Sequence, residues 1–274
     1  MRGKNAGKLS RAGVVLVCGI LFAATALADS TKAVRVEGYL VRDAVPSSLA
    51  QLPPPPVEGS PAMMLDEAIA QRSFSLRGTP RWQLAIADAD LGFPQAAGTF
   101  TCALGVGITQ NDTPHLWQLL QRSARDLAAT TRTAKEHYRR PRPFMVNGQP
   151  ICTPGDTRRL EREGSYPSAH TATGWGWALI LAELAPDRTD ALMVRGRAVG
   201  ESRNVCNVHW YSDVMQGRLI AAGTIARLHA EPAFRADLDA ARVELGAARA
   251  RGLLPTRDCA AETAALATTP SLAP

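Results

Sequence analysis

The sequence lacks most of the patterns that mark specialised classes of protein. Its 274 residues contain no internal repeat and no glycine-rich repeat, which excludes collagen-like chains. Charged residues make up only 20% of the chain against 46% hydrophobic residues, which excludes disorder throughout. Strand patterns are scarce. The length is sufficient to bury one large core, so we predict a folded, mostly helical protein.

Aromatic residues are few, at 5% of the chain, and no basic stripe accompanies the five tryptophans. A base-stacking surface is therefore not indicated. The 31 basic residues against 25 acidic ones give a formal charge of +6, which by itself would suggest a nucleic-acid partner. Four of these basic residues lie within residues 1–11, and removal of residues 1–28 leaves 27 basic against 25 acidic residues. We therefore predict no nucleic-acid partner.

Residues 1–28 have the three parts of a secretory signal peptide. A basic start is followed by an uncharged, mostly apolar run from Ala12 to Leu27, and Ala26-Leu27-Ala28 forms an A-x-A cleavage site. The alternative is a membrane anchor, but the run is shorter than the ~20 residues that span a bilayer. No other stretch is long and apolar enough to do so. We predict cleavage, export and no membrane association of the mature chain.

Cysteine is also scarce, and its spacing is informative. Cleavage after residue 28 removes Cys18 and leaves four cysteines: Cys102, Cys152, Cys206 and Cys259. An even number in an exported chain favours two disulfides, for which three pairings are open. The alternative is that one or more are buried free thiols. No C-x-x-C spacing exists, so a zinc site of that kind is not indicated.

Helical periodicity and start signals run through most of the chain. Pro53–Pro56 is expected to be an extended strap, and residues 92–98 and 144–164 are expected to be loops. The tail at 261–274 is rich in Ala, Thr and Pro and is expected to be mobile. The fold class that follows is all-α in a single domain. The expected helices cover residues 61–77, 114–137, 168–184, 186–203, 208–229 and 233–251, and a further helix begins at residue 80.

Three separated clusters carry the chemistry. In chain order they are Lys135 with Arg142-Pro143, then Pro167-Ser168-Ala169-His170, and then Ser202-Arg203 with His209 and Asp213. Each alone is weak evidence, because a lysine near an arginine is usually a solvated pair, a serine before a helix is usually a cap, and a His–Asp pair four residues apart is often a surface pair. Together they fix eleven identities at set offsets, which is much harder to obtain by accident.

These clusters resemble the signature of the phosphatidic-acid-phosphatase type 2 / vanadium haloperoxidase superfamily. Within it the chain resembles the class A bacterial non-specific acid phosphatases over roughly residues 39–229. The resemblance implies a helical bundle of the type 2 phosphatidic acid phosphatase kind over residues 29–260, a periplasmic location, and phosphomonoester hydrolysis without a metal or cofactor. It extends to further stretches: Ser48-Leu49-Ala50 before Pro53–Pro56, Ala134–Tyr138, Gly164–Ser168, and His209-Trp210 with Ser212-Asp213.

The predicted phosphate site uses Lys135, Arg142 and Arg203 as cations, with Ser168 and the backbone N–H of Ala169 at a helix start. Arginine suits two-pronged contact with phosphate oxygens, and a helix N-terminus favours an anion. The family usually has glycine where this chain has Ala169. The alanine keeps the N–H donor, but its methyl group is expected to alter rate or substrate range.

Two histidines are expected to divide the reaction. His209 would attack phosphorus as a neutral imidazole and form a phosphohistidine, with Asp213 one helical turn later fixing its tautomer. His170 would protonate the leaving alcohol and then activate water. The two should titrate as a coupled pair, which favours an acidic working range.

The leading hypothesis is therefore an exported acid phosphatase with a broad range of small phosphate monoesters and a potential for phosphotransfer to alcohols. A vanadate-dependent haloperoxidase using the same pocket is the main alternative. A membrane lipid phosphatase and a non-enzymatic anion-binding protein are disfavoured, because no spanning helix is predicted and no catalytic residue is missing. Homo-oligomers are common in the family. Specificity is expected to reside in the loops at 90–113 and 144–163.

Overall fold

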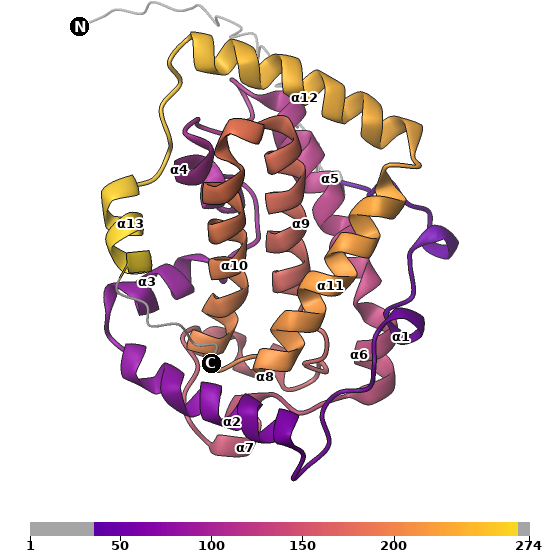
Figure 1. Cartoon of the computed structure of the whole chain (residues 1–274), viewed down its shortest axis with the longest axis vertical. Helices are drawn as coiled ribbons and strands as arrows, with labels where there is room; N and C mark the ends of the chain where they lie inside the picture. Colours follow the sequence, from indigo (N-terminus) through magenta and orange to yellow (C-terminus); the bar gives the residue numbers. More distant parts are fainter. Residues whose placement is uncertain (1–35, 268–274) are drawn as a thin grey trace, which may run out of the picture. The chain divides into compact units, whose positions relative to one another are not determined.

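The computed structural model describes residues 36–267, and the predicted signal peptide at 1–28 lies outside this range. From Val36 onward the chain forms one compact unit. The described residues fold into α-helices and short 3-10 helices without a strand, so the all-α prediction is confirmed (Figure 1). No helix among residues 36–267 is both long and apolar enough to cross a membrane.

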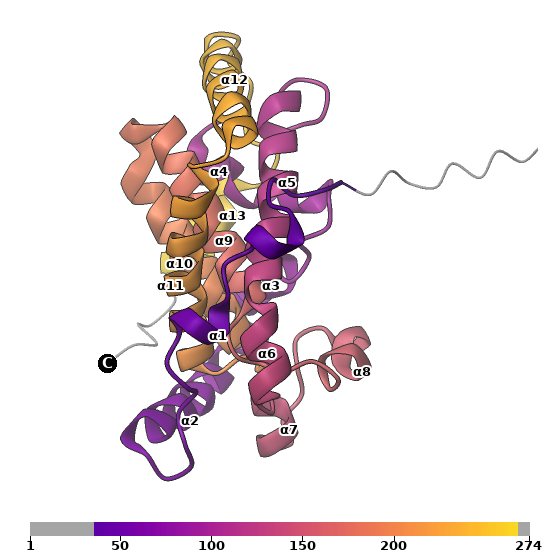
Figure 2. The ribbon, with the colours of Figure 1, turned by 90° about the vertical axis from the view of Figure 1, so that its right-hand side faces the viewer.

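Helix α9 (Ala169–Leu184) is the centre of the fold. It packs against α10 (Thr189–Val205), α11 (Tyr211–Leu228) and α5 (Pro114–Thr130), while α12 (Pro232–Ala250) lies against α5 and α9 at one end of this group (Figures 1 and 2). Small residues permit close contact of α9 with α10, since a Cβ on Gly174 would lie 2.5 Å from the Val199 side chain.

The core follows from the composition of α9, which is apolar on nearly every side and is therefore buried. Trp177 is fully buried, and its ring N–H donates to the Leu120 carbonyl of α5 at 2.9 Å. Phe93 and Phe100 contact its ring edge to face. One satisfied indole thus anchors the central helix against α5 and the segment before it.

Shorter elements surround this centre. In chain order they are η1 (Arg42–Ala44), α1 (Ser48–Gln51), α2 (Pro61–Ser73), η2 (Phe74–Leu76), α3 (Pro80–Ala87), η3 (Gln95–Phe100), α4 (Thr101–Leu104), α6 (Arg132–Tyr138), α7 (Pro143–Asn147), η4 (Pro154–Asp156), α8 (Thr157–Leu160), η5 (Pro186–Arg188) and α13 (Cys259–Ala267).

Three expectations about local structure differ from what is observed. The expected loop at 92–98 contains the first residues of the 3-10 helix η3. The helix predicted over 114–137 is two helices, because it is interrupted at Thr131, whose hydroxyl donates to the Ala128 carbonyl. The expected loop at 144–164 contains the short helices α7 and α8. The last two differences lie near residues of the predicted site.

The expectation of a mobile tail over 261–274 is wrong for residues 261–267, because these residues belong to α13. The side chain of Glu262 is only 7% exposed, with an oxygen 3.3 Å from Arg195 Nε, and Cys259 is disulfide-bonded. These long-range links hold a segment whose own composition gave no such indication. Residues 268–274 lie outside the described range.

The four cysteines form the two disulfides that the even count predicted. Cys102 pairs with Cys259 across 157 residues, and Cys152 pairs with Cys206 across 54 residues. The first ties α4 to α13. The second ties the segment between α7 and α8 to the end of α10, three residues after Arg203 and three before His209.

We expect the longer disulfide loop to stabilise the fold more. In the chain-entropy model, loops of these lengths give about 5 kcal/mol for Cys102–Cys259 and about 4 kcal/mol for Cys152–Cys206. Replacing each pair by serine and measuring urea unfolding would test this order. A smaller loss for the Cys102/Cys259 double variant would show that native contacts, and not loop length, set the difference.

Candidate active site

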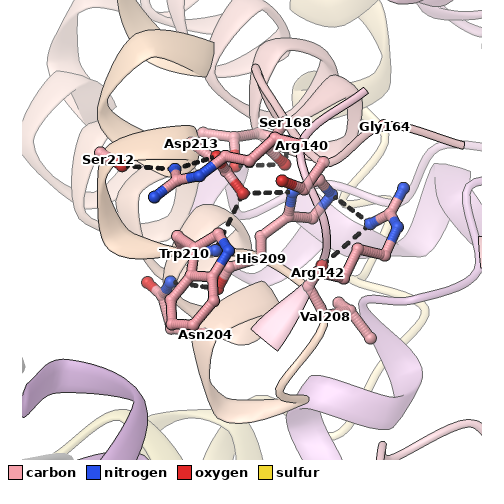
Figure 3. A network of polar contacts seen from close by, with 12 residues as sticks. Arg140, Arg142, Gly164, Ser168, Asn204, Val208, His209, Trp210, Ser212 and Asp213 are labelled. Carbon is pink, nitrogen blue, oxygen red and sulfur yellow. Dashed lines mark hydrogen bonds and ion pairs between the residues drawn. The ribbon is translucent and has the colours of Figure 1, made fainter. Parts of the chain in front are cut away.

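The three sequence clusters meet at one end of the central helices. The C-terminus of α10 and the N-termini of α9 and α11 converge there, and the backbone N–H of Ser168 donates to the Asp213 carbonyl at 3.0 Å. Figure 3 shows His209 at the centre of this group, between Arg142 on one side and Asp213 on the other. Residues separated by more than 70 positions are thereby in one site.

His209 is held at both ring nitrogens. Its Nδ1 lies 3.2 Å from Asp213 Oδ2, and its Nε2 lies 3.1 Å from Arg142 Nη1. Because arginine can only donate, Nε2 accepts and the proton resides on Nδ1. The Asn204 side-chain amide also donates to the His209 carbonyl at 2.9 Å. The structure therefore fixes both the orientation and the tautomer of this imidazole.

Burial and neighbouring cations keep His209 neutral. The residue is 3% exposed, and burial is the main cause that lowers its pKa well below the usual value. Arg142, Lys135 and Arg203 lower it further by repulsion. A neutral imidazole at this position retains the lone pair that a nucleophile needs.

Arg142 is held by neutral acceptors. Its Nε donates to the Leu160 carbonyl at 2.9 Å and its Nη1 to the Val208 carbonyl at 2.9 Å. The side chain is almost fully buried, and this burial lowers its pKa to about 10. The acidic group that pairs with Arg142 is the half-exposed Glu163, whose Oε2 lies 3.8 Å from Arg142 Nη2. Its positive charge is thus poorly compensated.

Arg203 and Lys135 resemble Arg142 in this respect. Arg203 is almost fully buried, and its Nε and Nη1 have no hydrogen-bond partner among the described residues. Burial and Arg142 lower its pKa to about 10. Lys135 Nζ donates to the Gly164 carbonyl at 2.6 Å, and burial followed by the repulsion of Arg142 lowers its pKa to about 7. Three cations with few counter-charges are the electrostatic pattern of an anion site.

The second cluster forms the first turn of α9. Ser168 is the N-cap, and its Oγ accepts from the backbone N–H of Thr171 at 3.2 Å. Ala169 begins the helix, so its backbone N–H is one of those without an intrahelical acceptor. His170 follows, with its Nε2 3.0 Å from the Ala89 carbonyl. Because a carbonyl only accepts, Nε2 carries the proton and Nδ1 remains for other chemistry.

His170 is also kept neutral. Burial is the largest cause that lowers its pKa well below the usual value, and the charge of Arg203 adds to it. Beyond burial, Arg203 and Arg142 lower the pKa of both predicted catalytic histidines. A dianion bound among these cations would raise the pKa of each imidazole again, because it favours the charged form of the ring.

Two important residues escaped the sequence analysis. Arg140 Nη1 lies 2.7 Å from Asp213 Oδ1, and Arg140 Nη2 lies 2.7 Å from Asp66 Oδ2 of α2. All three side chains are at most 6% exposed. Asp66 gave no signal, because a single carboxylate in a helix is usually solvated. The only hint for Arg140 was its position two residues before Arg142.

A cavity of about 820 Å³ adjoins the site beside Lys135, Gly164 and Ala169. The predicted specificity loop at 144–163 contributes to its wall, whereas the loop at 90–113 does not. The cavity is large enough for a small organic group beside Lys135, which is the one of the three predicted site cations that lines it. The remaining lining residues are both basic and acidic, with some apolar ones: Ala128, Thr131, Arg132, Glu136, Arg139, Arg140, Pro141, Met145, Glu161, Arg162 and Glu163.

Among residues 36–267, no group of three or more His, Cys, Asp or Glu side chains is arranged to hold a metal ion. The clustered chemistry consists instead of cations, two imidazoles and one carboxylate, with Arg140 and Asp66 behind that carboxylate.

Comparison with known proteins identifies the family of the chain. The PAP2 superfamily profile matches residues 124–234. An acid phosphatase of Zymomonas mobilis is 42% identical over 207 residues, which cover 76% of this chain and 78% of that protein. A non-specific acid phosphatase of Providencia stuartii is 42% identical over 75% of this chain and 84% of its own length, and one of Salmonella typhimurium is 37% identical over 82% and 91%. The chain therefore belongs to the PAP2 superfamily, among the relatives of bacterial non-specific acid phosphatases.

Proposed function

We propose that the protein is an exported acid phosphatase that hydrolyses phosphate monoesters through a phosphohistidine on His209. One observation carries this proposal: the His209 ring is fixed by Asp213 at Nδ1 while its Nε2 lone pair faces Arg142. The family membership and the names of three relatives as acid phosphatases support the same activity.

The uncompensated cations favour a phosphate ester as the ligand. Such an ester carries close to two negative charges, and its transition state spreads charge over three equatorial oxygens. The two unpartnered N–H groups of Arg203 supply donors for those oxygens, together with Arg142, Lys135 and the free N–H of Ala169. Ser168 holds the start of α9 in place for that contact.

In the first step, the Nε2 lone pair of His209 forms a bond to phosphorus as the bond to the leaving oxygen breaks. Arg142 Nη1, which donates to Nε2 in this structure, must then turn to a phosphate oxygen. Asp213 accepts from Nδ1–H and stabilises the positive charge that forms on the ring. His170 takes up a proton at Nδ1 when the dianion is bound, and it gives this proton to the leaving alcohol, while Nε2–H stays on the Ala89 carbonyl.

In the second step, His170 takes a proton from a water molecule whose oxygen attacks phosphorus. The P–N bond breaks, phosphate leaves, and His209 returns to its neutral form. An alcohol in place of the water would give phosphotransfer. The adjoining cavity, with lining of both charges and some apolar surface, suits leaving groups of varied chemistry, which supports a broad substrate range.

Export to the periplasm is supported by two features. Residues 1–28 have the composition of a signal peptide. The four remaining cysteines are all paired in disulfides, which form and persist in oxidising compartments.

The roles of the two histidines predict different kinetic defects. With an aryl phosphate, His209→Ala should lower kcat by at least about 10³-fold and abolish the phosphoenzyme, because the nucleophile is missing. His170→Ala should lower turnover by about 10²–10⁴-fold, yet it should still form phosphohistidine, since an aryl leaving group needs little protonation. Rapid quench in alkali, which preserves phosphohistidine, measures both steps.

Wild-type enzyme assayed beside these variants, with and without a chelator, is the control. Near-normal turnover by His209→Ala would refute the nucleophile assignment. Wild-type activity that depends on an added divalent metal would refute the metal-free reaction.

The pKa shifts predict an acidic working range. His209 remains neutral well below its usual pKa, so the nucleophile is retained in acid. Lys135, with a pKa of about 7, loses its positive charge as the pH rises above that value, which weakens phosphate binding. The value of kcat/KM should therefore be high in acid and fall above about pH 7, since it reports on free enzyme.

Lys135→Arg should move the alkaline fall of kcat/KM to higher pH, because a guanidinium keeps its charge. The position of the fall is the readout, whatever the absolute rate. A wild-type profile that is flat from pH 5 to 9, or a fall that stays in place in Lys135→Arg, would contradict the role of Lys135.

A further inference from the structure

The carboxylate that orients His209 is itself held from behind by a buried arginine. Asp213 Oδ2 accepts from His209 Nδ1 at 3.2 Å and from the backbone N–H of Trp210 at 2.9 Å. Its other oxygen, Oδ1, accepts from Arg140 Nη1 at 2.7 Å. The two oxygens therefore have separate partners, and rotation of the carboxylate would break contacts on both sides (Figure 3).

Arg140 is in turn fixed by a second carboxylate. Its Nη2 donates to Asp66 Oδ2 at 2.7 Å, and Asp66 also accepts from the backbone N–H and hydroxyl of Ser212 at 2.7 and 2.6 Å. The guanidinium carbon lies 5.4 Å from the centre of the Trp210 ring. Helix α2, the segment after α6 and the start of α11 are thus joined at one buried cation.

We propose that Arg140, held by Asp66, is a positioning residue for the phosphoryl transfer assigned above. It fixes the side-chain conformation of Asp213 so that Oδ2 stays on His209 Nδ1–H. This inference rests on the proposed function of His209.

The charges of this group suit the reaction. Asp66, Arg140 and Asp213 together carry one net negative charge, which faces a neutral imidazole before the reaction. When His209 becomes a phosphoimidazolium, its ring gains one positive charge. The three residues and the ring together then carry no net charge. An unpaired second carboxylate would be costly at this depth, and Arg140 offsets it.

Arg140 is distinct from the phosphate-binding cations. Arg142 and Lys135 donate mainly to carbonyl oxygens and Arg203 has unpartnered N–H groups, whereas Arg140 engages two carboxylates. It therefore has little free charge for substrate. Its loss should lower kcat with little change in KM, because orientation of the nucleophile is affected and phosphate binding is not.

The test measures phosphohistidine formation in Arg140→Gln by alkaline rapid quench with an aryl phosphate. We expect the rate constant for formation to fall about 10–100-fold, the range for groups that orient a functional imidazole or its partner. Arg140→Lys should recover part of this loss. The downfield proton resonance of His209 Nδ1–H should shift in Arg140→Gln, because Asp213 is no longer fixed.

The matched control is Arg122→Gln. Arg122 also pairs with an aspartate, Asp237, and lies over an aromatic ring, that of Tyr39, but it belongs to α5 and contacts no site residue. In Arg122→Gln, the rate of phosphohistidine formation and the His209 Nδ1–H resonance should match those of the wild type. A defect of the same size in Arg122→Gln would overturn the proposal, because loss of any arginine would then suffice.

If Arg140→Gln does not fold, Asp66→Asn carries the test. It keeps the shape of the contact and removes one charge, and the formation rate should fall with KM unchanged. A wild-type rate in the folded variant overturns the proposal, as does a raised KM with unchanged kcat. If the wild type itself forms no phosphohistidine, the proposed function of His209 fails, and the role of Arg140 falls with it.

Discussion

Three cations largely removed from water, with few carboxylates to balance them, are the constraint on which the rest of the site depends. Lys135 and Arg142 donate mainly to backbone carbonyls, and two nitrogens of Arg203 have no partner among the described residues. Neutral acceptors fix the geometry of Lys135 and Arg142 without cancelling their charge. Burial first, and then the positive potential of the cations, lowers the pKa of His209 and of His170 and keeps both rings neutral.

The ends of three helices converge to place these cations and the two histidines in one site. The end of α10 and the starts of α9 and α11 bring the motifs together, and the carbonyls that hold the cations come from the segments beside them. The Cys152–Cys206 disulfide ties one of these segments to α10. Two other buried arginines have the opposite arrangement: Arg195 pairs with Asp88, and Arg140 with Asp66 and Asp213. Arg81 is also buried, but it donates to the Ser202 hydroxyl and the Ala198 carbonyl, so neutral acceptors alone do not mark a predicted site residue.

Much of the fold was predictable because its signals are local. Periodicity and start signals such as Thr113-Pro114 predicted the helices, and the even number of cysteines after residue 28 predicted two disulfides. The tail was mispredicted up to Ala267, because the contacts that hold α13 come from residues more than 60 positions away, as with Glu262 and Arg195. The break at Thr131 was missed for a related reason, since a hydroxyl that bonds its own helix leaves no mark in the hydrophobic pattern.

The sequence by itself determined the family and the all-α class, and it named the candidate residues for the chemistry, because these depend on residue identities at fixed spacings. Only the tertiary structure decided the tautomer of His209, the pairing of the cysteines and the place of Arg140 between Asp66 and Asp213. These features depend on distances between segments that are far apart in the chain. A pKa shift likewise depends on burial and on the charges that folding brings near, and neither is present in any local stretch of sequence.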